Sequence, residues 1–117
     1  MRMRVEQVGP SIIIVELQGR LDTAGAADIT PEMCAAAAAN SGMVVDLARV
    51  SFLASIGVRL LLQTAKIVQR QGGRQVLLDP ASDVKQILEV TGVADLVPIH
   101  NDRDQALLMV SQQSNPR

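Results

Sequence analysis

The amino-acid sequence predicts an α/β domain built on a mostly parallel sheet. After an opening hairpin, short strand-like segments alternate with helical segments, which is the pattern of a parallel sheet with helices packed on it. The 117 residues have the length of one domain, and the 48% of apolar residues can form a core without a disulfide or metal. No repeat or linker marks a second domain, so residues 1–117 are expected to form one domain.

The strands are expected where β-branched residues cluster. Residues 11–17 are dense in isoleucine and valine, residues 3–8 alternate weakly, and the Gly9-Pro10 turn joins the two segments into a hairpin. The later short apolar runs predict further strands at residues 42–47, 74–79 and 96–99. Pro98 favours an edge position for the last of them because proline cannot donate a ladder hydrogen bond.

Four helices are expected between and after these strands. The first, residues 24–40, contains an unbroken alanine run and either begins near Pro31, with Thr30 as its N-cap, or is kinked there. Residues 48–54 are expected to be a connection, and the tail 113–117 is expected to be disordered. The other helices are expected at residues 55–71, 82–90 and 102–112.

Composition excludes several classes of function. One cysteine, Cys34, can form neither an internal disulfide nor a Cys-based zinc site, and one histidine, His100, leaves little for imidazole-centred catalysis. A net charge of −1 and a single aromatic residue, Phe52, argue against a nucleic-acid binder. No apolar stretch has the length of a membrane span. We expect a cytoplasmic binding protein, not an enzyme, with no cofactor, no metal, no nucleic-acid partner and no membrane partner.

The segment around Ser55 carries the strongest functional signal. A hydrophobic strand runs into a helix that Ser55 opens, so its hydroxyl is predicted to be the N-cap. Gly57 costs about 1 kcal/mol relative to alanine in a helix, but it allows a backbone or a bulky group to come close. A phosphate on Ser55 would lie beside free amides at the positive end of the helix dipole. The residues alone favour a purely structural role for both positions, with Ser55 as a helix cap and Gly57 as a residue that allows close packing.

The helix at residues 55–71 is predicted to have a second apolar stripe. The face expected to pack on the sheet consists of Val58, Leu61, Leu62, Ala65 and Val68. The roughly opposite stripe consists of Ile56, Leu60 and Ile67, flanked by Arg59, Gln63, Lys66 and Arg70. Such a stripe is typical of a partner-binding surface, and cover by a neighbouring helix of the same layer is the alternative.

Three ordered segments carry a family resemblance, and they are G-R-L-D-T at residues 19–23, V-D-L-A-R-V-S-F-L-A-S-I-G at residues 45–57 and L-E-V-T-G-V at residues 88–93. With this order and spacing the chain resembles the STAS domain family, most closely the small anti-sigma factor antagonists of bacteria. The resemblance covers nearly the whole chain. It implies a mixed, mostly parallel sheet of about five strands, with helices packed mainly on one side.

The resemblance also implies a function in transcription regulation by partner switching. Such antagonists bind an anti-sigma factor that is a serine kinase, and so release the sigma factor. The kinase phosphorylates a serine at the start of the second helix, which breaks the complex, and a PP2C-type phosphatase reverses the modification. The motif match places the phosphoacceptor at Ser55 and a neighbouring acidic position at Asp22. The implied partner-binding residues are Asp22, Thr23, Ala54, Ser55, Ile56, Gly57, Arg59 and Leu60.

The sequence departs from the family pattern on both sides of Ser55. Many antagonists have aspartate before this serine and a small residue after it, whereas Ala54 and Ile56 stand here. This departure points to a specialised kinase. The alternatives are a non-switching STAS scaffold of another signalling or lipid-transport complex, in which Ser55 is only a cap, and a small-molecule sensor. The exposed stripe would also suit a weak homodimer.

Overall fold

The structure is a computed structural model that describes residues 1–111, so the tail at 113–117 lies outside the described residues. The α/β class and the five-stranded sheet expected from the sequence are confirmed. In chain order the elements are β1 (Arg2–Gly9), β2 (Ile12–Leu21), α1 (Thr23–Ala38), β3 (Gly42–Leu53), α2 (Ser55–Arg70), β4 (Arg74–Leu78), α3 (Ser82–Val90), α4 (Val93–Leu96), β5 (Ile99–His100) and α5 (Arg103–Ser111).

The sheet is mixed, with its strands in sequence order from β1 to β5. The hairpin strands β1 and β2 are antiparallel, and every later pair is parallel. This follows from the connections, because a tight turn can only join antiparallel strands, whereas a helix crossover brings the chain back in parallel. The expected edge position of the last strand is confirmed.

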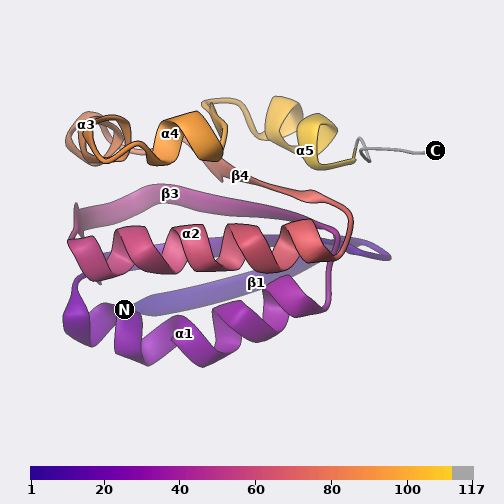
Figure 1. Cartoon of the computed structure of the whole chain (residues 1–117), viewed down its shortest axis with the longest axis horizontal. Helices are drawn as coiled ribbons and strands as arrows, with labels where there is room; N and C mark the ends of the chain where they lie inside the picture. Colours follow the sequence, from indigo (N-terminus) through magenta and orange to yellow (C-terminus); the bar gives the residue numbers. More distant parts are fainter. Residues whose placement is uncertain (112–117) are drawn as a thin grey trace.

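Helices cover the two faces of the sheet unequally. Figure 1 shows α2 running across the sheet between α1 and the pair α3 and α4. The larger part of the core lies beneath these helices. Helix α5 packs against β3 and β4 from the other face, where a smaller cluster consists of Ile14, Val44, Val76, Leu78, Ala106 and Val110. The helices therefore lie mainly on one side, and much of the opposite face is left to side chains of the strands.

Strands β2 and β3 are longer than their apolar runs. Their pairing continues to Leu21 beside Leu53, so residues 48–54 are mostly strand and not the expected connection. The pairing register shifts between Glu16 and Gln18 and again after Gly19, whose φ is +116°. These shifts break the two-residue alternation that would have revealed a strand in the sequence.

Helix α1 runs through Pro31 and does not begin there. Thr30 is therefore not its N-cap, and its hydroxyl donates to the carbonyl of Ala26 at 2.6 Å. The side that faces the core holds the helix across the proline, and it consists of Gly25, Ala26, Ile29, Met33 and Ala37. Packing of this side outweighs the hydrogen bond that proline cannot make.

The segment after α3 differs from the expected strand at residues 96–99. Gly92 adopts a φ of +84°, which ends α3 and starts the short helix α4. Val93 and Val97 are both buried and fix this helix on the core. Strand β5 is therefore only the two residues Ile99–His100.

Candidate functional site

The carboxyl ends of β2 and β3 bring the two predicted site loops together. Leu21 and Leu53, the last residues of these strands, are paired neighbours. The chain then enters α1 through Asp22 and α2 through Ala54, and the Ala54 N–H donates to the carbonyl of Leu21 at 3.0 Å. The Asp22 loop and the start of α2 are thus joined directly by a backbone hydrogen bond.

Asp22 is the N-cap of α1, and its carboxylate is held from two sides. One oxygen, Oδ1, accepts a hydrogen bond from the Gly25 backbone N–H at 2.9 Å, as an N-cap aspartate is expected to do. The other, Oδ2, lies 3.3 Å from Nε of Arg20. The Gly25 N–H and, to a smaller extent, Arg20 hold the pKa of the Asp22 carboxyl below its ordinary value of 3.8. At neutral pH the site therefore carries a fixed negative charge.

Arg20 and Phe52 extend this cluster, and sequence reasoning did not single out either of them for the site. They are paired neighbours on β2 and β3, and the Arg20 guanidinium carbon lies 4.2 Å from the centre of the Phe52 ring. This is a cation–π contact at the surface, since the Phe52 side chain is 38% exposed. Their proximity depends on the shifted register of β2 and β3, which no local sequence signal reveals.

Ser55 is the first residue of α2, and the prediction that it is the N-cap is wrong. The cap position belongs to Ala54, which has no side-chain oxygen to offer. The Ser55 side chain is exposed, and its hydroxyl has no hydrogen-bond partner among the described residues. The first backbone N–H groups of a helix also have no partner within it. At the start of α2 the Ala54 and Gly57 N–H groups are bonded, to the carbonyls of Leu21 and Ala54, whereas those of Ser55 and Ile56 have no partner among the described residues. The accessible Ser55 hydroxyl therefore stands beside two unsatisfied amides.

Gly57 is buried where α2 meets the ends of β2 and β3. A Cβ at this position would lie 2.7 Å from Cγ of Leu21 and 2.8 Å from Cδ1 of Leu53. Real Cβ atoms do not approach other atoms so closely, so only glycine fits without a shift. This close packing places the first turn of α2 directly against the end of the sheet.

Leu60 does not belong to the surface, contrary to the prediction. Its side chain is 3% exposed and lies in the core beneath the helices. The buried side of α2 includes Gly57 and Thr64, whose hydroxyl donates to the carbonyls of Leu60 and Leu61. A helical projection based on apolar residues alone leaves out Gly57 and Thr64, and it therefore places the buried side of α2 wrongly. Helix α1 packs against α2 within the same layer.

The eight predicted partner-binding residues therefore divide by exposure. Thr23, Ser55 and Arg59 are exposed; Asp22, Ala54 and Ile56 are half-buried; Gly57 and Leu60 are buried. The exposed and half-buried residues form the outer surface where α1 and α2 begin, and the buried two support it from beneath. Their role in partner binding stays a prediction.

The exposed side of α2 contains a shallow hollow that the sequence did not predict in this form. Its volume is about 380 Å³, and it is lined by Arg59, Leu62, Gln63, Lys66, Ile67 and Arg70. Leu62, which was expected to face the sheet, is half-buried and faces this hollow. We call these six residues the outer face of α2.

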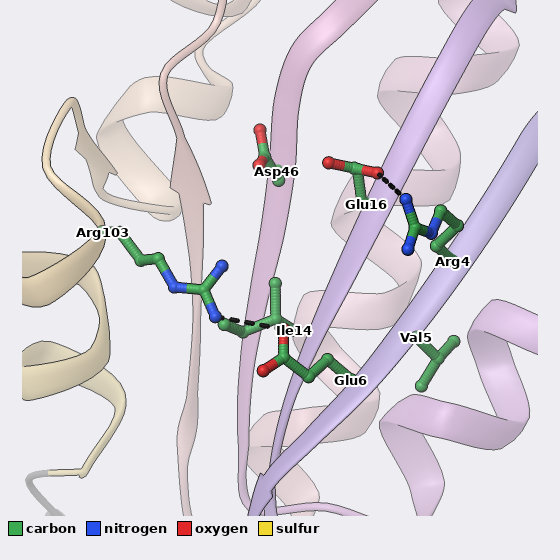
Figure 2. Close-up of a pocket in the computed structure, with 7 residues that line it drawn as sticks. All are labelled: Arg4, Val5, Glu6, Ile14, Glu16, Asp46 and Arg103. Atoms are coloured by element: carbon green, nitrogen blue, oxygen red, sulfur yellow. Dashed lines mark hydrogen bonds and ion pairs between the residues drawn. The ribbon is translucent and has the colours of Figure 1, made fainter.

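A second hollow, of about 320 Å³, lies on the face of the sheet that α5 only partly covers. Figure 2 shows Arg103 of α5 reaching Glu6 of β1, and Arg4 of β1 pointing toward Glu16 of β2. The first pair is 3.1 Å apart and the second 3.9 Å. Ion pairs between its lining residues thus satisfy much of the charge in this hollow.

The other polar candidates take structural roles. The backbone carbonyl of His100 accepts a hydrogen bond from the Asp79 N–H at 2.8 Å, and Asp102 Oδ1 accepts from the first amides of α5. Within residues 1–111, no three His, Cys, Asp or Glu side chains are grouped as a metal site would need. The same residues contain no helix long and apolar enough to cross a membrane.

Comparison with known proteins decides the family. The family model of the STAS domain matches residues 4–106, which are most of the chain. The chain belongs to the STAS domain family. This match spans the sheet and the site at the ends of β2 and β3, and it confirms the resemblance carried by the three sequence segments.

Named relatives of this STAS domain are anti-sigma factor antagonists. BtrV of Bordetella bronchiseptica, a candidate antagonist by its description, is 28% identical over 109 residues, which are 91% of each chain. The anti-sigma-F factor antagonist RsfA of Mycobacterium tuberculosis is 27% identical over 83% of this chain and 78% of its own.

Solved structures share the fold of this STAS domain. SpoIIAA, an anti-sigma factor antagonist, matches in its unphosphorylated form with a TM-score of 0.78 at 23% identity, over 91% of this chain and 93% of that one. The phosphorylated form of the Bacillus protein matches with a TM-score of 0.71 at 22% identity, over 91% and 96% of the two chains. At these identities the likeness shows the fold alone.

Proposed function

We propose that this STAS domain is an anti-sigma factor antagonist whose partner is both an anti-sigma factor and a serine kinase. Binding would release a sigma factor, and phosphorylation of Ser55 would end the binding. The observation that carries the proposal is the exposed, unbonded hydroxyl of Ser55, held beside the Asp22 loop at the ends of β2 and β3. The names of BtrV and RsfA support the antagonist role.

The position of Ser55 suits a reversible phosphate. Because its hydroxyl bonds to no described residue, a phosphoryl group can be added without breaking a contact within the fold. The new group carries about −1.5 to −2 charges, which the free amides and dipole of the helix start tolerate. The phosphate then destabilises the complex with the partner and not the fold. A loss of about 1.4 kcal/mol of binding free energy weakens that binding tenfold.

Asp22 gives the surface a permanent negative charge, in addition to the charge that a phosphate on Ser55 would bring. Its carboxylate is ionised and held by Gly25 and Arg20, so a partner meets it in one position. A group of the partner that binds this carboxylate would also lie near Ser55. A phosphate added there would face any acidic or apolar group of the partner that lies over Ser55, and this contact would disfavour the bound state.

The residues that flank Ser55 suggest how a kinase would select it. Ala54 is half-buried and its N–H is already bonded to Leu21, whereas Ile56 offers a half-buried apolar side chain. The kinase would read apolar surface here instead of an acidic residue. Return to the binding state would require a PP2C-type phosphatase, and the exchange would take place in the cytoplasm.

The direct test is intact mass with site mapping of the protein purified from its own cells. We expect one phosphate on Ser55, present under some growth conditions and absent from a Ser55→Ala variant. Ser82→Ala is a matched control, because Ser82 is also the exposed first residue of a helix that follows an alanine cap. This control is expected to keep the phosphate.

Two results together would refute the switch. The first is that no phosphate is found under any growth condition. The second is that the Ser55→Asp variant binds the co-purified partner as tightly as the native protein does. A non-switching STAS scaffold would then be the better account. A co-purified partner without a kinase fold would point the same way.

A further inference from the structure

The outer face of α2 is a basic surface with no acidic residue of its own helix. The helix contains Arg59, Lys66 and Arg70 but no aspartate or glutamate. All three cations are exposed and line the same hollow. In a chain with a net charge of −1, this concentration of positive charge is local to one helix.

The charges on this face are unbalanced within the described residues. The four ion pairs between those residues are Met1 N-terminus with Asp28, Arg4 with Glu16, Arg20 with Asp22 and Arg103 with Glu6. The helices beside α2 do carry carboxylates, among them Glu32 and Glu89. Neither comes within ion-pair distance of a cation on the outer face. These cations are therefore available to an acidic partner.

Apolar side chains form the floor of the same face. Leu62 and Ile67 are half-buried and line the hollow between the basic residues. From Arg59 to Arg70 the helix rises about 16 Å at 1.5 Å per residue, or about three turns. An apolar floor with a cationic rim, three turns long, is complementary to a helix that carries leucine-like residues between aspartates and glutamates.

We infer that the outer face of α2 docks an acidic amphipathic helix of the partner protein, and that phosphate on Ser55 competes for Arg59. The inference rests on the proposed function and names the partner chemistry at that site. Ser55 and Arg59 are four residues apart on one helix, so their side chains are neighbours. A phosphate at this distance can accept charge-assisted hydrogen bonds from the guanidinium.

Phosphorylation would then act on binding in two ways. It adds negative charge at the end of a surface that attracts an acidic helix, and it engages the first cation of that surface. Arg59 would be needed both for full affinity and for the full effect of the phosphate. Lys66 and Arg70 lie further along the helix and would contribute to affinity only.

The test uses the full chain and a synthetic acidic peptide of about fifteen residues, with leucines on one face and glutamates beside them. Binding is measured by fluorescence anisotropy, and the site is mapped by amide chemical shifts of the 15N-labelled protein. The triple variant Arg59→Gln, Lys66→Gln, Arg70→Gln is expected to lose roughly tenfold in affinity. The matched control is the triple variant Arg2→Gln, Arg4→Gln, Arg49→Gln, which removes the same amount of charge from β1 and β3. This control is expected to keep the affinity within about twofold.

The competition is tested with phosphoserine placed at position 55 by genetic encoding. The phosphate is expected to weaken peptide binding severalfold, and Arg59→Gln is expected to reduce this effect. Lys66→Gln serves as the control and should leave the effect of the phosphate intact.

Several outcomes would overturn the inference. They are shifts that map outside α2, equal losses in the two triple variants, and unchanged binding of a peptide with glutamine in place of glutamate. Binding of phosphatidylserine vesicles through the same cations, without peptide binding, would assign the face to a membrane instead. Because the peptide experiment needs no kinase, its failure is distinct from a missing phosphate on Ser55 in cells.

Discussion

Gly57 shows how a residue that looks unfavourable can be required. A glycine in the first turn of α2 weakens the helix, yet a Cβ there would meet Leu21 and Leu53 below 3 Å. The sequence indicated that something approaches this position, because glycine permits close approach. It could not indicate that the partners are the two strand ends, since these meet only in the folded sheet.

Gly57→Ala is expected to destabilise the domain by about 1–3 kcal/mol. The gain in helix propensity, about 1 kcal/mol, is smaller than the cost of shifting the ends of two buried strands. Urea unfolding measures the change, with Ser55→Ala as the control in the same turn. Ser55→Ala removes no hydrogen bond and should stay within about 0.5 kcal/mol. A more stable Gly57→Ala protein would contradict this packing.

Asp22 gives the folded state a predictable dependence on pH. Its pKa is lowered by folding, so its charge stabilises the domain above the unfolded value near 3.8, and this contribution is lost as pH falls toward the lower folded value. Asp22→Asn keeps a side-chain oxygen for the Gly25 N–H but removes the charge. Urea unfolding should find the variant less stable than the native protein at pH 7, and this difference should shrink as the pH is lowered to about 2.5. An equal difference at both values would contradict the assignment.

Helix α2 shows the limits of reading an element from its apolar residues. Its bounds follow from the sequence, but its rotation does not, because Gly57 and the polar Thr64 are buried. Thr64 is acceptable inside because its hydroxyl bonds to carbonyls of its own helix. The apolar pattern therefore indicated where the helix lies, and misassigned Leu60 and Leu62.

Gln75 is a weak point in the packing of β4 beneath α2. Its side chain is 3% exposed, and its Nε2 donates to the Leu61 carbonyl at 3.1 Å. Its Oε1 is buried and has no partner among the described residues. An unpaired buried carbonyl costs about 1–3 kcal/mol, whereas one hydrogen bond contributes about 0.5–1.5 kcal/mol.

Gln75→Met is therefore expected to leave stability unchanged or to raise it by about 1 kcal/mol. Methionine keeps the shape of the side chain and removes both polar ends. Gln105→Met, at an exposed position of α5, is the control and should have little effect. Urea unfolding decides the matter, and a loss above about 1 kcal/mol would show that the Leu61 hydrogen bond outweighs the unpaired oxygen.

In the molecule as a whole, the buried core supports the fold, and a separate surface is left open to a partner and to a phosphate. The Ser55 hydroxyl, the Asp22 carboxylate and the outer face of α2 lie at or near the surface, whereas Gly57 and Leu60 hold these groups from beneath. The three sequence segments were enough to predict the family, and they made the Asp22 loop and Ser55 the candidate site. The cation–π pair of Arg20 and Phe52 and the basic hollow required the register of the strands and the rotation of the helix.

This arrangement predicts that phosphorylation of Ser55 leaves the fold intact. Phosphoserine at position 55 meets free amides at a helix start, which should keep or raise stability by about 0.3–1 kcal/mol, a rise in Tm of a few degrees. Amide shifts should be confined to the first two turns of α2, which include Arg59, and to the Asp22 loop. Phosphoserine at position 111, at the end of α5, is the contrasting control. There the hydroxyl donates to the Leu107 carbonyl and the helix dipole opposes an anion, so Tm should fall. If position 55 instead lowered Tm by about 5 °C or more, the switch would act by unfolding the domain and not by blocking its surface.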